Sequence, residues 1–219
     1  MGSATAFSMN YAHEFGTDWK QAVAYANEHQ AEWIEVFREF GVAPRVASAI
    51  VFPELIRYSR WQDEIESAAV GAFYVIGGRS QANFSIGRFQ MKPSFAEEVE
   101  AEWNKSPLSV ELGFKFNLRD DADARRHRVS RLSSDEGQCR YLAMFVRLQL
   151  LRNPEIATLP AEEQVRLLAT AYNRSFSASL IQLKAMQKER NFYTDMIRTH
   201  STRFYSYSDI ALAYYRLCG

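Results

Sequence analysis

The sequence predicts a mainly α-helical domain with a small β element. Apolar residues recur every three or four positions along most of the chain, whereas a β-rich stretch with paired glycines is confined to residues 72–78. The 219 residues are enough for one sizeable hydrophobic core. We therefore expect a single domain over residues 17–219, preceded by an N-terminal tag and extension over residues 1–16.

The first two helices are predicted from apolar periodicity and from the residues that bound it. Large apolar side chains repeat with helical spacing over residues 17–40, and Gly41 follows as a stop signal. Pro44 then occupies a position that the first turn of a helix tolerates. This second helix runs towards Glu54, and Pro53 predicts a kink or a restart beside the acid, because proline lacks the backbone donor that an uninterrupted helix uses.

The stretch after this helix has a different composition. Residues 72–76 are rich in aromatic and β-branched side chains, and Gly77-Gly78 supplies turn residues, so we expect a small β-hairpin lobe between residues 68 and 89. Helix is expected again from Pro93, where Ser94 and Glu97 have the spacing of a capping box.

Residues 104–132 are mixed and charged without a sustained period, and we interpret them as a long insertion or a second edge of a cleft. This stretch contains a basic cluster flanked by three aspartates, for which a solvated loop is expected. The cluster comprises Arg125, Arg126, His127, Arg128 and Arg131.

The second half of the chain predicts four helices. The strongest period covers residues 133 to about 152 and marks a central core helix that ends before Pro154. A helix from about residue 160 ends at Asn173, another covers residues 177–189, and a short one covers residues 208–217.

Composition excludes several classes of function. The 26 basic residues balance 26 acidic residues, so no overall charge attracts nucleic acid. No apolar run approaches the ~20 residues of a membrane span, and the first three residues resemble a remnant of an expression tag. The four histidines and two cysteines have no metal-ligand spacing, so we expect no metal or organic cofactor. Separate buried thiols at Cys139 and Cys218 are favoured over a disulfide bridge.

Glu54 is the candidate for acid chemistry. Apolar residues surround it in the sequence, and an apolar setting raises a carboxyl pKa because it penalises the charged form. A carboxylic acid that stays protonated near neutral pH can protonate a glycosidic oxygen. The simpler interpretation of an isolated glutamate is a solvated side chain on a helix.

Two further segments change that interpretation. The first carries, in order, Ser85, Gly87, Gln90, Met91, Pro93 and Ala96, and the second is Ala171-Tyr172-Asn173 at a predicted helix end. Glycine permits close approach of a ligand to the backbone, and a glutamine side chain can both donate and accept hydrogen bonds from sugar groups.

Together the three segments resemble the active-site pattern of the lysozyme-like lytic transglycosylases, within the superfamily of soluble lytic transglycosylases and goose-type lysozymes. The resemblance implies a lysozyme-like fold with a glycan-binding cleft. It also implies that the chain is a distant member of this family. It implies that Glu54 is the catalytic acid, that Tyr172 hydrogen-bonds it, and that further side chains line the glycan groove. These groove residues are Ser85, Gln90, Met91 and Asn173.

The chain also departs from the family pattern. Leu55 follows the acid where the family commonly has serine, and Arg174-Ser175 follows the Tyr-Asn pair where Ala-Gly is common. Arg88 and Lys92 add two cations that we expect near the cleft.

The resemblance implies cleavage of peptidoglycan between N-acetylmuramic acid and N-acetylglucosamine, with 1,6-anhydro products, in the periplasm or cell envelope. The partner is then the glycan strand of the cell wall. A hydrolytic muramidase is the first alternative, and it needs a second carboxylate, for which Asp63, Glu64 and Glu66 are available. A non-catalytic glycan-binding module that kept the fold is the second.

Overall fold

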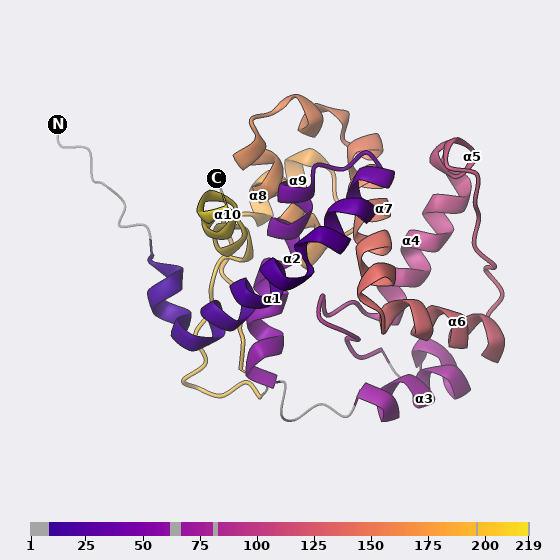
Figure 1. The fold of residues 1–219 in the computed structure, drawn as a ribbon, viewed down its shortest axis with the longest axis horizontal. Helices are drawn as coiled ribbons and strands as arrows, with labels where there is room; N and C mark the ends of the chain where they lie inside the picture. The colour runs from indigo at the N-terminus through magenta and orange to yellow at the C-terminus, as the bar shows by residue number, and fades with distance from the viewer. Residues whose placement is uncertain (1–8, 62–66, 81–82, 196, 219) are drawn as a thin grey trace.

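The computed structural model describes residues 9–61, 67–80, 83–195 and 197–218, which are mostly helical (Figure 1). No sheet forms among these residues, although isolated antiparallel bridges join Ile86 to Met91 and Phe192 to Tyr205. The mainly α class is therefore confirmed. The helices are α1 (Tyr11–Glu39), α2 (Pro44–Trp61), α3 (Ser67–Gly77), α4 (Pro93–Lys105), α5 (Leu108–Glu111), α6 (Ala122–Leu132), α7 (Asp135–Arg152), α8 (Ala161–Arg174), α9 (Leu180–Met186) and α10 (Tyr207–Leu217), with short 3-10 helices at Gly78–Ser80 and Pro154–Thr158.

The N-terminal boundary of the domain lies earlier than expected. The Asn10 side chain accepts a hydrogen bond from the backbone of His13 and caps α1, and Tyr11 and Phe15 are buried in the core. Gly16 has a φ of 50° and introduces a kink at the predicted boundary. Residues 11–16 therefore belong to the domain, and residues 1–8 lie outside the described part of the chain.

Helix α2 is covered by three other helices. It packs against α1, α8 and α10, and residues 49–56 are all buried. Pro53 lies inside this helix, which continues to Trp61, so the predicted restart at Glu54 is wrong. A helix that is buried on all sides can absorb the lost backbone hydrogen bond because its tertiary contacts hold it in place.

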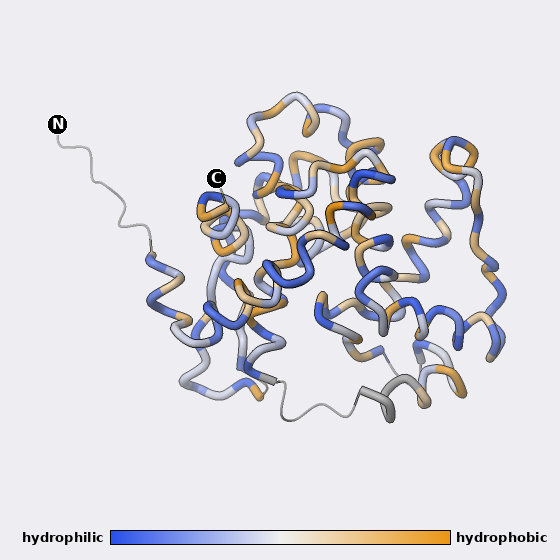
Figure 2. The backbone as a smooth tube through the Cα atoms, viewed as in Figure 1, coloured by the Kyte–Doolittle hydropathy of each residue, from blue (hydrophilic) through white to orange (hydrophobic). Residues whose placement is uncertain are grey.

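Helix α7 separates two groups of helices in Figure 1. Helices α1, α2, α8, α9 and α10 lie on one side of it, and α3, α4, α5 and α6 lie on the other. Figure 2 shows hydrophobic and hydrophilic residues alternating along most helices, as amphipathic helices around a common core require. The prediction of a core helix at residues 133–152 agrees with the eleven buried residues of α7.

The predicted β-hairpin lobe is wrong at residues 72–76, which belong to α3. Phe73 and Ile76 are 63% and 80% exposed, whereas Tyr74 is buried against the neighbouring helices. Intrinsic β-propensity decides little without a partner strand, and here α3 instead packs against α6. The bridge between Ile86 and Met91 is the β element that remains in this stretch.

Three smaller expectations also need correction. Lys92, with no side-chain hydrogen bond, is the N-cap of α4, so Ser94 and Glu97 form no capping box. Helix α9 is shorter than the predicted helix at residues 177–189. Cys139 is a buried free thiol, but Cys218 is exposed rather than buried.

The basic cluster at residues 125–131 is part of helix α6, not a solvated loop. Arg128 is buried and donates two hydrogen bonds to Glu100, a fully buried carboxylate on α4. Arg131 donates to the other oxygen of Glu100 at 2.7 Å, and the Tyr141 hydroxyl donates to the same oxygen.

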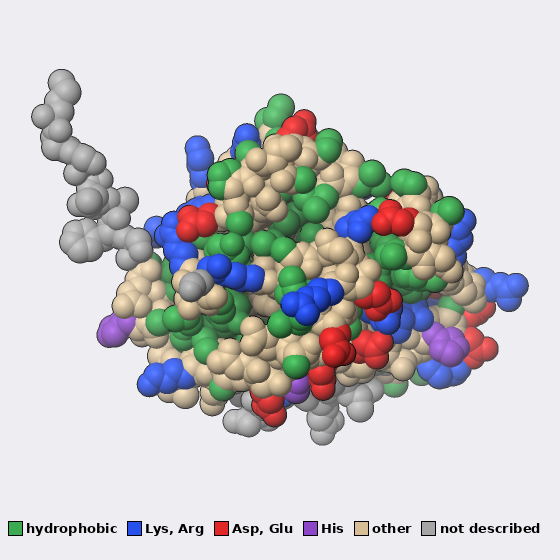
Figure 3. Space-filling model, turned by 45° about the horizontal axis from the view of Figure 1, so that its top comes forward, with side chains coloured by type: hydrophobic (Ala, Val, Ile, Leu, Met, Phe, Trp, Pro, Cys, Tyr) green, Lys and Arg blue, Asp and Glu red, His purple; other side chains and the backbone are tan. Residues whose placement is uncertain are grey.

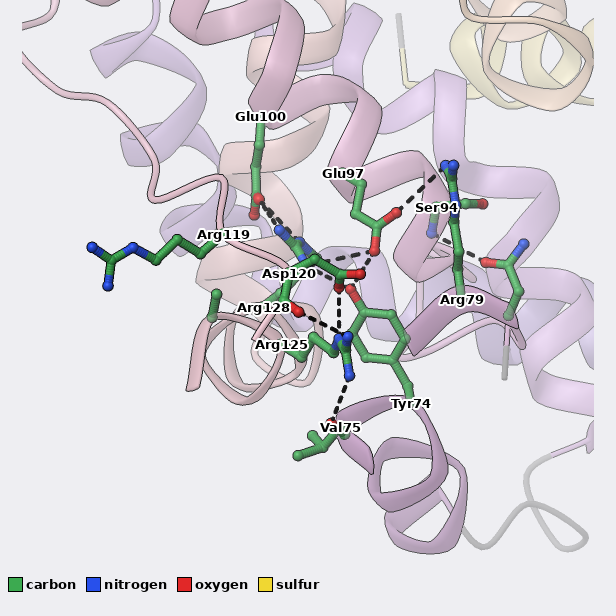
Figure 4. A network of polar contacts seen from close by, with 12 residues as sticks. Tyr74, Val75, Arg79, Ser94, Glu97, Glu100, Arg119, Asp120, Arg125 and Arg128 are labelled. Carbon is green, nitrogen blue, oxygen red and sulfur yellow. Dashed lines mark hydrogen bonds and ion pairs between the residues drawn. The ribbon is translucent and has the colours of Figure 1, made fainter. Parts of the chain in front are cut away.

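The Tyr74 hydroxyl of α3 extends this network by donating to Glu97 at 2.6 Å (Figure 4). The side chains converge between α3, α4 and α6, whereas Arg119 extends away from them in the same view. The network therefore ties α3 and α6 to α4 by charge-assisted hydrogen bonds, because a charge this deeply buried requires partners.

We predict that Arg128→Met destabilises the fold by about 3–5 kcal/mol, because it leaves Glu100 buried with one arginine fewer. Urea denaturation followed by circular dichroism measures the loss. The matched control is Arg126→Met on the same helix, where the side chain is 64% exposed and pairs with exposed Asp123. Its cost is expected to stay within about 0.5 kcal/mol. Equal losses in the two variants would contradict the structural role of the network.

Candidate functional site

Helix α2 places the Glu54 carboxyl in the core. The residue is 5% exposed, and the apolar neighbours predicted from the sequence, Phe52 and Leu55 among them, are buried with it. One turn further along α2, Arg57 donates from Nη1 to Glu54 Oε2 at 2.9 Å. Residues three apart lie on the same face of a helix, so the backbone of α2 alone can bring this pair together.

Burial and the nearby positive charges have opposite effects on the pKa of Glu54. Burial raises the pKa of Glu54 above its ordinary value, and the positive charges of Arg57 and Lys92 act in the lowering direction. Burial outweighs the cations. Glu54 is therefore a carboxyl that holds its proton to higher pH than a solvated glutamate does.

Two tyrosines from different helices approach Glu54. Tyr172 belongs to α8 and Tyr207 to α10, and the pKa of each phenol is raised well above its ordinary value, first by burial and then by the charge of Glu54. Both phenols therefore keep their protons across the physiological range and are available as hydrogen-bond donors.

The Tyr172 hydroxyl connects α8 to the turn at residues 86–91. It donates its one hydrogen to the backbone carbonyl of Phe89 at 2.7 Å and not to Glu54, so it does not make the hydrogen bond to the acid that the resemblance implied. Its ring also makes edge contacts with Phe95 and Phe145. Tyr172 thus contacts the turn and lies within range of the Glu54 charge.

The turn itself has a demanding backbone geometry. Ile86 and Met91 exchange two backbone hydrogen bonds of 2.8 and 3.2 Å, and Gly87 and Gln90 have φ values of 69° and 52° between them. Gln90 Nε2 donates to the Gly87 carbonyl at 2.9 Å and closes the turn from within. The backbone of Phe89 donates to the buried Gln138 side chain of α7 at 2.7 Å, which fixes the turn to the core.

The predicted groove residues occupy different environments. Ser85 is half-buried at the start of the turn, Gln90 is buried, and Met91 is buried in the hydrophobic core. Asn173 is half-buried and its side-chain amide is 3.5 Å from the Asn191 side chain. Of the predicted set, Tyr172 and Asn173 line a cleft in the described part of the chain.

The cleft has a volume of about 890 Å³ and runs between α4 and the end of α8. Its wall on the α4 side carries Ser94, Phe95, Glu97 and Glu98, and the opposite wall is the segment from Tyr172 to Ser177. Tyr172 lines this cleft and is affected by the charge of Glu54, which is not itself among the lining residues.

Arg88 and Lys92, the two cations that we expected near the cleft, differ in position. The Arg88 guanidinium lies 4.3 Å from the ring centres of both Tyr25 and Tyr58, where it holds the turn against α1 and α2. Arg88 does not line the cleft, contrary to expectation. Lys92 is exposed, and its charge acts on Glu54.

The cleft contains carboxylates that sequence reasoning did not single out. Glu97 is held by Tyr74, and Asp120 by Arg125 at 2.7 Å, whereas burial raises the pKa of Glu98. Asp63, Glu64 and Glu66, the acids named for a hydrolytic reaction, lie outside the described residues.

Arg57 is another residue that the sequence did not single out for this site, and the sequence did not pair Tyr207 with Glu54. The spacing of three between Glu54 and Arg57 is a usable signal for an ion pair. Tyr207 stands near the C-terminus, and its proximity to α2 depends on how α10 packs.

The described residues carry surface charges of both signs and contain neither a cluster of metal ligands nor a membrane-spanning helix. Basic and acidic side chains are interspersed over the face in Figure 3, in keeping with the zero formal net charge. No group of three or more potential metal ligands occurs in the part of the chain that the structure describes. Within the same ranges, no helix has both the length and the apolar character of a membrane span.

Comparison of the chain with protein-family models, with curated proteins and with solved structures finds no match.

We predict that Gly87→Ala disrupts the turn. A Cβ at this position would lie 2.7 Å from the Leu132 carbonyl and would collide with the Gln138 side chain. Overpacking combined with a left-handed backbone predicts a loss of roughly 2–5 kcal/mol in the free energy of unfolding. Urea denaturation measures it.

Gly113→Ala provides the matched control, because Gly113 has a φ of 73° but no atom within 4 Å of the added Cβ. Only backbone strain of about 1–2 kcal/mol is expected there. If Gly87→Ala cost no more than Gly113→Ala, the close approach of α7 to the turn would not constrain the site.

Proposed function

We propose that the protein is a lytic transglycosylase that cleaves the glycan strands of peptidoglycan, with Glu54 as its general acid and base. The observation that carries this proposal is the convergence of three segments far apart in the sequence. Glu54 lies on α2, the turn closes at Met91, and Tyr172 of α8 hydrogen-bonds that turn while the charge of Glu54 raises the pKa of its phenol. These are the segments on which the resemblance rests.

A lysozyme-like arrangement is part of the proposal. An enclosed helix supplies the acid, a tight turn next to it approaches the ligand with its backbone, and a cleft begins at Tyr172. The small β lobe of that arrangement would be reduced to the bridge at Ile86 and Met91. A cell-wall substrate places the protein in the periplasm or cell envelope.

The chemistry assigned to Glu54 has two steps. The protonated carboxyl gives its proton to the oxygen between N-acetylmuramic acid and N-acetylglucosamine as the bond from that oxygen to the muramic C1 breaks. The resulting carboxylate then accepts the proton of the C6 hydroxyl, whose oxygen bonds to C1 and closes the 1,6-anhydro ring. A carboxyl whose pKa is raised by burial suits the first step.

Glu54→Gln is expected to lower the rate of glycan cleavage by about 10²–10⁴-fold, because an amide cannot transfer the proton. Mass spectrometry of products from purified peptidoglycan measures the rate and identifies the ends formed. Glu98→Gln, which removes another carboxyl of raised pKa from the cleft wall, is the matched control and should retain activity.

Free reducing ends in place of anhydro ends would support the muramidase alternative. Full activity of Glu54→Gln would contradict the assignment of the acid, and loss of activity in Glu98→Gln alone would move that role into the cleft.

A non-catalytic glycan-binding module is the second candidate, and the ion pair between Glu54 and Arg57 favours it. The Arg57 guanidinium favours the ionised form of this carboxyl, which is 5% exposed, and the ionised form has no proton to donate. Glycan binding by the intact protein without any turnover would support this candidate. Turnover that is lost in Glu54→Gln would exclude it.

A further inference from the structure

Arg57 is held by several groups besides Glu54. Its Nε donates to the backbone carbonyl of Tyr193 at 3.1 Å, while its Nη1 donates to Glu54 Oε2. The guanidinium also lies 4.2 Å from the ring centre of Phe192. The side chains of Arg57 and Glu54 are 17% and 6% exposed, so the pair is largely shielded from water.

These contacts give the guanidinium one orientation. Phe192 is itself fixed by its backbone bridge to Tyr205, and its ring makes an edge contact with Tyr207. Because a guanidinium is planar and its donors point in fixed directions, anchoring Nε and the ring face also fixes the direction of Nη1. The segment after α9 therefore determines, through Arg57, where the Glu54 carboxyl points.

We propose that Arg57 is a positioning residue for Glu54, which orients the acid and competes with the proton for its carboxylate. The inference rests on the proposed function for its catalytic meaning, although the ion pair can be tested without it. In a cleavage reaction the two effects are distinct. Orientation affects the rate at every pH, whereas competition with the proton determines the pH range in which the acid is protonated.

The sign of the pH effect follows from the groups that act on Glu54. These are Arg57 on the same helix, Lys92 at the start of α4 and Tyr207 on α10, and the charge of Glu54 in turn acts on Tyr172 of α8. Both phenols are neutral in the relevant range, so Arg57 and Lys92 carry the opposing charge. Removing the Arg57 charge leaves burial less opposed, so Glu54 should keep its proton to higher pH.

The first experiment follows the Glu54 carboxyl directly. Protein labelled with carbon-13 at glutamate carboxyls is titrated by nuclear magnetic resonance, and Glu54→Gln assigns the signal. Arg57→Met is expected to move the Glu54 midpoint upward by about one to three pH units. Arg60→Met is the matched control, since Arg60 lies on the same helix and contacts Thr194 and Asp195 but pairs with Asp18 instead of Glu54.

Arg57→Lys separates charge from orientation and protects the test against a variant that does not fold. It keeps the cation but cannot donate to Glu54 and Tyr193 with fixed geometry. We expect a midpoint near that of the unmodified protein together with a lower kcat and an unchanged KM on purified peptidoglycan. In Arg57→Met, the fall of kcat at high pH should shift upward with the midpoint.

An unmoved Glu54 midpoint in Arg57→Met, or an equal shift in Arg60→Met, would overturn the proposal. So would an Arg57→Lys variant with full kcat, because orientation would then not depend on the guanidinium. If the unmodified protein cleaves no glycan, the proposed function fails, while the carboxyl titration still decides whether Arg57 controls the Glu54 proton. If Glu54→Gln abolishes cleavage but Arg57→Met leaves the midpoint unmoved, only the proposal for Arg57 fails.

Discussion

The burial of one carboxyl on α2 is the constraint on which the rest of the site depends. Helices α1, α8 and α10 cover α2 so closely that Glu54 keeps almost no contact with solvent. A carboxylate in such a place requires a cation or a proton, and Arg57 supplies the cation from one turn away on the same helix. The C-terminal segment is then recruited to hold that cation through Tyr193 and Phe192. Packing around α2 and the electrostatics of Glu54 are thus parts of one arrangement.

The turn at residues 86–91 depends on the same enclosure from the other side. Its left-handed residues can be accommodated because α7 supplies Gln138 as an acceptor for the Phe89 amide, and α8 supplies the Tyr172 hydroxyl for the Phe89 carbonyl. Both polar groups of one peptide segment are therefore satisfied by side chains from different helices. Arg88, stacked between two tyrosines, adds a third attachment to α1 and α2. A short segment with no regular structure acquires a fixed conformation in this way.

Much of this arrangement can be predicted from the sequence, and the failures have physical reasons. The apolar periodicity of α1, α7 and α8 predicts these long helices from the sequence. Glu54 and Tyr172 are predicted as site residues because they occur together with the segment from Ser85 to Ala96. The sequence predicts a β element within α3 because the β-propensity of its residues does not reveal that the neighbouring element is a helix. The sequence predicts a solvated Arg128 because no residue near it in the sequence reveals its partner Glu100, which is 28 positions away. Tyr207 reaches the site through the tertiary contacts of α10, which local sequence patterns do not predict.

The described residues include two deeply buried glutamates, Glu54 and Glu100, and their different surroundings suit different purposes. Glu100 receives hydrogen bonds from Arg128, Arg131 and Tyr141, so its charge is compensated on both oxygens and the carboxylate is held as a structural ion. Glu54 is paired with one arginine, and burial prevails in raising its pKa. Hydrogen bonds to both oxygens hold a carboxylate in place as part of the fold, whereas a carboxyl whose pKa is raised by burial can exchange a proton with a ligand. The contrast within one fold is the physical reason to assign chemistry to Glu54 and structure to Glu100.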